Sequence, residues 1–192
     1  EGKTAVKKHW KAVKTAGILA FYLCLWQIAA LVVHNPILFV GPKETAMSLF
    51  IMVKTSEFWF SIGNTFLRIG GGFLTGTVLA VLAAVIAYHS AVVGDFLEAL
   101  VAVQKTIPVA SFVILFLIWA GNRNLAFFIV WIVVFPVVYL NLTEGLNSMD
   151  AKMLEMAKVF RIGWRRRVRA IVFPEIRPFF LAAMKNAWGM SW

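Results

Sequence analysis

The chain has 192 residues, of which 61% are hydrophobic, 15% aromatic and only 15% charged, and its mean hydropathy is +0.81. This composition excludes an ordinary soluble domain, in which about half of the residues are apolar. The net charge of +10 does not indicate a nucleic-acid partner, because most of the basic residues flank apolar segments and none alternate with aromatic residues on a polar surface.

Four apolar segments of 18 to 21 residues occupy positions 16–33, 69–87, 100–120 and 125–142. A helix needs about 20 residues to cross about 30 Å of hydrocarbon, so each segment is predicted to span a membrane. A fifth apolar segment, 179–192, has 14 residues and would rise only about 21 Å as a helix. The predicted fold for residues 1–192 is therefore a single all-α, polytopic transmembrane domain whose fifth span is truncated. Because the chain opens on Glu1 and stops within the fifth segment, we expect it to be incomplete at both ends.

Basic residues set the predicted topology. Residues 1–15 and 143–178 together hold 13 of the 19 lysines and arginines, and an even number of crossings separates the two segments. The positive-inside bias therefore places both segments, and with them the N-terminus, in the cytoplasm. The segment 34–68 is predicted to be external, and within it a stretch that opens at Pro42 and includes Phe50 and Trp59 is predicted to form an interfacial helix.

Three features inside the apolar segments point to packing or to a pathway. Gly72 and Gly76 are four residues apart, a spacing that permits close packing of helices in lipid. Pro108 and Pro136 are predicted to kink the third and fourth spans. Lys105 precedes Pro108, and a charge at the bilayer centre costs about 2.5–3.5 kcal/mol on insertion scales. Lys105 therefore either snorkels to the interface or lines a pathway for an anionic substrate.

Residues 150–174 form a charged island between apolar segments. Asp150 is a suitable N-cap, and apolar residues at helical spacing come after it, which predicts a short helix with one apolar face; these residues are Met153, Met156, Ala157 and Phe160. Gly163 is predicted to end this helix, and a second short helix is predicted from Trp164 to Phe173, with Pro174 and Pro178 interrupting the chain beyond it. The island either lies against anionic lipid headgroups or is bound by a partner protein.

The island resembles the EAA signature of bacterial ABC-importer permeases. The matching residues are Glu155 and Ala157, followed by Ile171, Phe173 and Pro174; Met156 replaces the first alanine of the signature, and Arg161 stands where a glycine is usual. Four other stretches are similar to the nitrate, sulfonate and taurine group of these permeases: Val40-Gly41-Pro42, Thr65 to Gly72, Lys105 to Ala110, and Asn186 to Trp192.

The resemblance implies a permease subunit of an ATP-driven importer in the bacterial cytoplasmic (inner) membrane, carrying a small anionic or polar solute such as nitrate, a sulfonate or taurine. It implies ATPase subunits that hold ATP and Mg²⁺, a second permease subunit that forms a homodimer, and an extracytoplasmic substrate-binding protein. No cofactor is expected in this chain. The residues that would couple to the ATPase, with Ala157 facing into its cleft, are Glu155, Met156, Ala157, Phe160, Arg161, Gly163 and Pro174; Lys105 and Pro108 are the pathway candidates.

Two other function classes fit the residues less well. A secondary transporter or channel with a basic cytoplasmic loop should carry acidic residues deep in its spans, whereas Glu98 and Glu144 lie near span ends. A membrane-embedded enzyme should show a motif such as HExxH or paired aspartates, and the sequence has neither. The single Cys24 lies in an apolar segment, so no metal site based on cysteine is predicted.

Overall fold

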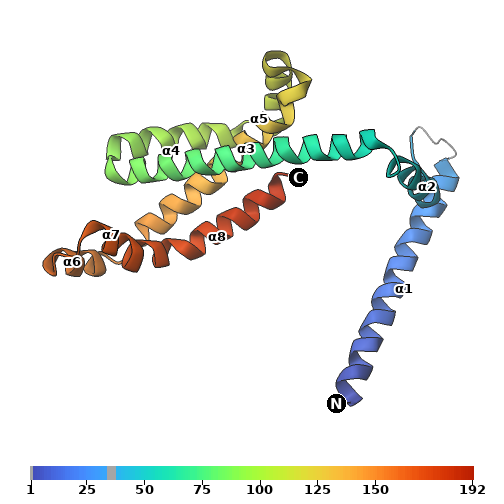
Figure 1. Cartoon of the computed structure of the whole chain (residues 1–192), viewed down its shortest axis with the longest axis horizontal. Helices are drawn as coiled ribbons and strands as arrows, with labels where there is room; N and C mark the ends of the chain where they lie inside the picture. The colour runs from blue at the N-terminus through green and yellow to red at the C-terminus, as the bar shows by residue number, and fades with distance from the viewer. Residues whose placement is uncertain (1, 34–37) are drawn as a thin grey trace. The chain divides into compact units, whose positions relative to one another are not determined.

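The computed structural model describes residues 2–33 and 38–192, with the side chains of 2–9, 11 and 12 left out of the description. Residues 34–37, part of the segment predicted to be external, lie outside the described residues. The described chain is helical and contains no strand, which confirms the all-α class. Its elements (Figure 1) are α1 (Gly2–Val33), α2 (Pro42–Met52), α3 (Ser56–His89), α4 (Ala91–Thr106), α5 (Val109–Asn147), α6 (Ala151–Val159), α7 (Trp164–Arg167), the π-helix η1 (Val168–Val172) and α8 (Phe173–Met190).

Three of the described helices are long and apolar enough to cross a membrane: Val13–Val33, Ser56–His89 and Val109–Asn147. They contain the first, second and fourth predicted spans. The prediction of one continuous helix over 100–120 is wrong, because α4 ends at Thr106 and Ile107 is extended, with φ −82° and ψ 125°. The cause is Pro108, which has no N–H to donate and disfavours helical geometry at the residue before it.

The chain forms two compact units, Glu1–Ile62 and Gly63–Trp192, which we describe separately. In unit 1 the indole Nε1 of Trp26 on α1 donates to the carbonyl of Val40 at 3.0 Å, just before Pro42 opens α2. Phe50 on α2 is exposed, as an interfacial helix requires. Trp59, however, belongs to α3, so the predicted interfacial stretch is divided between two helices.

In unit 2 the helices pack through small side chains, as is typical of helix interfaces in lipid. α5 lies along α8 (Figure 1), and α4 also contacts α5. The buried alanines of the core cluster come from α3 and α8; they are Ala80, Ala84, Ala183 and Ala187. Gly72 and Gly76 lie where α3 meets α5, against Phe127 and Val130 and against Trp131 and Val134 respectively.

Gly72→Ala should lower the free energy of unfolding by about 1–3 kcal/mol. The new Cβ would fall against the backbone carbonyl oxygen of Phe127, which cannot yield without a shift of α5. Gly70→Ala on the same helix is the matched control, since a Cβ there meets nothing within 4 Å. Thermal unfolding of the purified variants in detergent measures the difference. Equal midpoints for the two variants would contradict this packing.

The segment after Gly163 is continuously helical through α7, η1 and α8, so the prediction that Pro174 and Pro178 interrupt it is wrong. The π-helical turn explains why. The amide of Phe173 donates to the carbonyl of Val168, five residues back, and this wider spacing changes the hydrogen-bond register just before Pro174 removes a donor.

Candidate functional site

Helix α6 of the charged island begins where the sequence predicted. The Asp150 carboxylate accepts from the backbone N–H of Lys152 at 2.9 Å, which confirms the N-cap. The helix ends in a Schellman turn, in which Ile162 N–H donates to the Ala157 carbonyl at 2.9 Å and Arg161 N–H donates to the Lys158 carbonyl at 3.0 Å. Arg161 takes the left-handed conformation of this turn, with φ 48°.

The turn therefore falls at Arg161, and the prediction that Gly163 ends the helix is wrong. Gly163 has φ −57° and ψ 147° and instead precedes the first residue of α7. Arg161 occupies the position at which the EAA signature carries glycine, so the backbone keeps the shape of the signature although the residue has changed. The left-handed conformation is unfavourable for any residue with a Cβ.

Arg161→Gly should raise the free energy of unfolding by about 1 kcal/mol, because it relieves the left-handed strain. Gly163→Ala is the control. It should change stability by less than about 0.5 kcal/mol, since its φ is negative and the new Cβ meets nothing within 4 Å. Thermal unfolding in detergent measures both variants. A loss of stability in Arg161→Gly would show that the turn does not need this conformation.

The two faces of α6 differ in exposure. Ala157 is 1% exposed within this chain alone, and Leu154 lines an internal groove with Val172 and Ile176. The prediction that Ala157 presents a free face to an ATPase is therefore wrong, because the small side chain already seats α6 against its own chain. The outward apolar residues, which we call the coupling surface, are Met153, Met156, Val159 and Phe160, exposed by 42%, 45%, 77% and 73%.

The other predicted coupling residues lie on the same charged island. Glu155, Arg161 and Gly163 are exposed beside the coupling surface, and Pro174 is exposed at the start of α8. In unit 2 the island lies at the end where α3 turns into α4 (Figure 1). Most of these residues are thus exposed, with Ala157 as the exception.

Lys105 lines a cavity of about 360 Å³ between the end of α4 and the middle of α5. Gln104 and Asn141 line the same cavity, and sequence reasoning missed both of them. Their signal was available, since side-chain amides are rare and costly in apolar helices. Pro108 does not line the cavity, but it ends the helix that carries Lys105. One cation and two amides in an otherwise apolar cavity can bind a small anion or polar solute.

Gln104 also supplies the hydrogen bond that is missing in α5 because of Pro136. In a regular helix the N–H of residue 136 would donate to the carbonyl of Ile132, but proline has no N–H. The Nε2 of Gln104 donates to that carbonyl instead, at 2.5 Å. This bond ties the end of α4 to the proline site of α5 and so holds Lys105 beside the cavity.

Gln104→Leu should lower the free energy of unfolding by about 1–3 kcal/mol, because it leaves the Ile132 carbonyl without a donor. The same change made with Pro136→Ala should cost much less, since the alanine N–H restores the helical bond. A double-mutant cycle on thermal unfolding gives the coupling between the two positions. Additive effects would mean that the Gln104 amide does not replace the missing proline donor.

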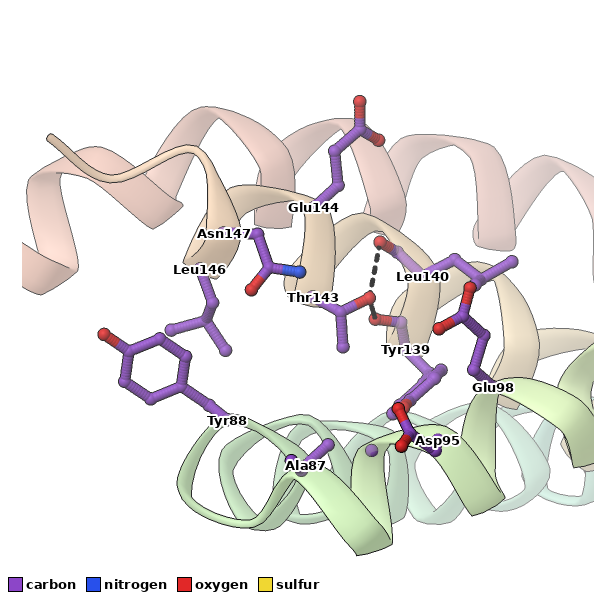
Figure 2. A pocket seen from close by; sticks show the side chains of 12 residues that line it. Ala87, Tyr88, Asp95, Glu98, Tyr139, Leu140, Thr143, Glu144, Leu146 and Asn147 are labelled. Carbon is purple, nitrogen blue, oxygen red and sulfur yellow. Dashed lines mark hydrogen bonds between the residues drawn. The ribbon is translucent and has the colours of Figure 1, made fainter. Parts of the chain in front are cut away.

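A second cavity, of about 490 Å³, lies between the start of α4 and the last turns of α5. Asp95 and Glu98 lie along α4, whereas the carboxylate of Glu144 points away from them (Figure 2). The hydroxyl of Thr143 donates back to the carbonyls of Tyr139 and Leu140, at 3.0 Å each. Among the described residues no group of histidine, cysteine or acidic side chains is arranged to hold a metal ion.

The chain is similar to several known transport proteins. Residues 76–192, which include α4 to α8, match the family model of binding-protein-dependent transport system inner membrane components. The chain is 22% identical over 97% of its length to SsuC of Bacillus subtilis, a permease named for aliphatic sulfonates, and covers 68% of that protein. It is 20% identical over 91% of its length to the nitrate import permease protein NrtB of Synechococcus elongatus, covering 66% of it. It is 23% identical over 92% of its length to the bicarbonate transport system permease protein CmpB of the same species, covering 67%.

Proposed function

This chain belongs to the family of inner membrane components of binding-protein-dependent transport systems, and on that premise we propose that it forms the substrate pathway of an ATP-driven importer for a small oxyanion or similar polar solute. It is a transport subunit and not an enzyme, since the relatives are permeases and ATP hydrolysis belongs to a separate ATPase. The observation that carries the proposal is the coupling surface, an exposed apolar patch at the end of a charged island that bears the EAA-type residues.

The substrate class is inferred from the cavity at Lys105. Three of the relatives are named for sulfonates, nitrate and bicarbonate, which are oxyanions, and a fourth is named for formylaminopyrimidine, which is a polar solute but not an oxyanion. A lysine ammonium with neighbouring amides suits such a solute, because charge-assisted hydrogen bonds are about twice as strong as neutral ones. Lys105 is exposed on the described chain, and we place it on the interior face of a permease dimer formed by a second copy of this chain.

The proposed mechanism begins at the coupling surface. ATPase subunits in the cytoplasm grip this surface, and their closure on ATP and Mg²⁺ moves the helices of unit 2 as rigid bodies. Leu154 of α6 packs against the core of unit 2, and this contact would transmit the movement to the other helices. A substrate-binding protein on the opposite side delivers the solute.

The proposal is tested by coexpressing the full-length permease with a candidate ATPase subunit from the same organism. We expect the two to copurify, and vesicles that contain both to show ATP-dependent uptake when the substrate-binding protein is supplied with the solute. Uptake driven by an ion gradient in the absence of any ATPase would instead identify a secondary transporter.

The orientation has its own test. With Cys24 replaced by serine, single cysteines are placed at Ser56 and Ser148, both of which are exposed. An impermeant thiol reagent on intact cells should label Ser56→Cys and spare Ser148→Cys, because residues 143–178 and the N-terminus are assigned to the cytoplasm. The reverse labelling would overturn the assignment.

A further inference from the structure

A groove of about 470 Å³ opens between the last turns of α3 and the charged island. Its volume falls within the roughly 300–1,000 Å³ typical of ligand sites. The wall is apolar over most of its length and is built from α3, α5, η1 and α8. Its apolar lining residues include Val81, Val85, Leu142, Val168, Val172 and Ile176.

One rim of the groove carries positive charge. Lys158 and Arg167 line it, together with His89 and the aromatic rings of Tyr88 and Trp164. No carboxylate lines the groove, and neither Lys158 nor Arg167 has an ion-pair partner in the described part of the chain. The indole of Trp164 is 67% exposed, and tryptophan is enriched where a membrane meets water.

The two parts of the groove call for different chemistry in one ligand. A soluble anion would pair with the cations but leave the apolar wall exposed to water. An apolar peptide would cover the wall but leave two cations unpaired. A lipid with an acyl chain and a charged phosphate satisfies both, and basic pockets between helices on the cytoplasmic side of a membrane commonly bind such headgroups. The position also fits, because the charged island is assigned to the cytoplasmic side.

We propose that this groove binds one anionic glycerophospholipid of the cytoplasmic leaflet. An acyl chain lies along the apolar wall, and the phosphate is held by Lys158 and Arg167 at the rim. The lipid would contact the end of α3, α6 and η1 together, and so stabilise the packing of α6, the helix that carries the coupling surface. This assignment does not depend on which solute the permease carries.

The full-length permease, coexpressed with its ATPase and purified in mild detergent, is exposed to vesicles of equal parts phosphatidylglycerol and phosphatidylcholine. Native mass spectrometry then counts the retained lipids. The wild type should keep phosphatidylglycerol in preference to phosphatidylcholine. Lys158→Gln with Arg167→Gln should lower that retention about thirtyfold, at about fivefold for each cation near an anionic lipid.

Lys152→Gln with Arg166→Gln is the matched control, since it removes the same charge from exposed positions outside the groove and should retain the lipid. Val85→Trp fills the groove without changing its charge and should also lower retention, which tests the wall even if the double variant does not assemble. Excess inorganic phosphate should not displace the lipid. Equal losses in the two charge pairs, displacement by phosphate, or equal retention of phosphatidylcholine would each overturn the proposal.

Discussion

Phe160→Asp is expected to lower ATP-driven uptake by at least about thirtyfold while leaving the fold intact. Aromatic side chains at the centre of an interface commonly contribute 2 kcal/mol or more to binding, which corresponds to about this factor. Phe160 is 73% exposed on the isolated chain, so its own chain does not require it for packing, and stability should change by less than about 0.5 kcal/mol. Uptake by vesicles that contain the permease and ATPase measures the effect.

The control is Ala151→Asp, which introduces the same charge at the first residue of α6, away from the coupling surface. A carboxylate in the first turn of a helix is favourable, so this variant should transport normally. Ala157→Arg is a different case, because Ala157 is buried within its own chain. It should lower the midpoint of thermal unfolding as well as uptake. Normal uptake by Phe160→Asp would remove the coupling surface from the mechanism.

Lys105→Gln is expected to lower uptake about tenfold to a hundredfold, with a much smaller effect on the stimulation of the ATPase. Hydrogen bonds to a charged group contribute about 1.5–3 kcal/mol, and glutamine keeps the polarity of the site but loses the charge. Lys105→Arg keeps the charge and should retain much of the uptake. Transport and ATP hydrolysis are measured in the same vesicles, so that binding of the solute is separated from coupling.

The outcome for Lys105 decides between the two roles that the sequence left open. If both variants transport at the original rate, the lysine is a snorkelling anchor at the interface. In that case Gln104 and Asn141, which line the same cavity, become the remaining polar candidates for contact with the solute.

Hydropathy predicted which helices are long and apolar enough to cross a membrane, because length and apolar composition are properties of the local sequence. It gave no sign of the kink inside α5, where Gly121 has φ 69° and ψ 168°. It failed at 100–120, where one proline divides an otherwise uninterrupted apolar segment between α4 and α5. It also missed the continuity from α7 to α8, where the hydrogen-bond register changes in η1 just before Pro174. Neither the effect of Pro108 nor that of η1 can be read from mean hydropathy.

In the charged island, too, the features that depend on neighbouring residues were predicted, whereas those that depend on tertiary packing were not. The N-cap at Asp150 depends on neighbouring residues and was predicted correctly. The spacing of Met153, Met156, Ala157 and Phe160 predicted one common face, yet Ala157 lies inward and the other three outward. The four residues cover a broad strip of the helix surface, so a residue at one margin of the strip can be buried while the others are exposed. Only the tertiary packing of α6 shows that the buried residue is Ala157. The left-handed conformation of Arg161 could not be predicted from the residue itself, since arginine gives no signal for positive φ; the only signal was that the EAA signature usually has glycine at this position.

Site-specific photocrosslinking from position 160 tests the central claim most directly. A photoreactive amino acid replaces Phe160 in the full-length permease, which is coexpressed with its ATPase and irradiated in membranes, and a second variant carries it at the buried position 157 as the reference. The coupling surface predicts a crosslink to the ATPase from position 160 and none from position 157. A crosslink from position 160 only to lipid, or to the ATPase only from position 157, would contradict the docking of α6 through its exposed apolar face.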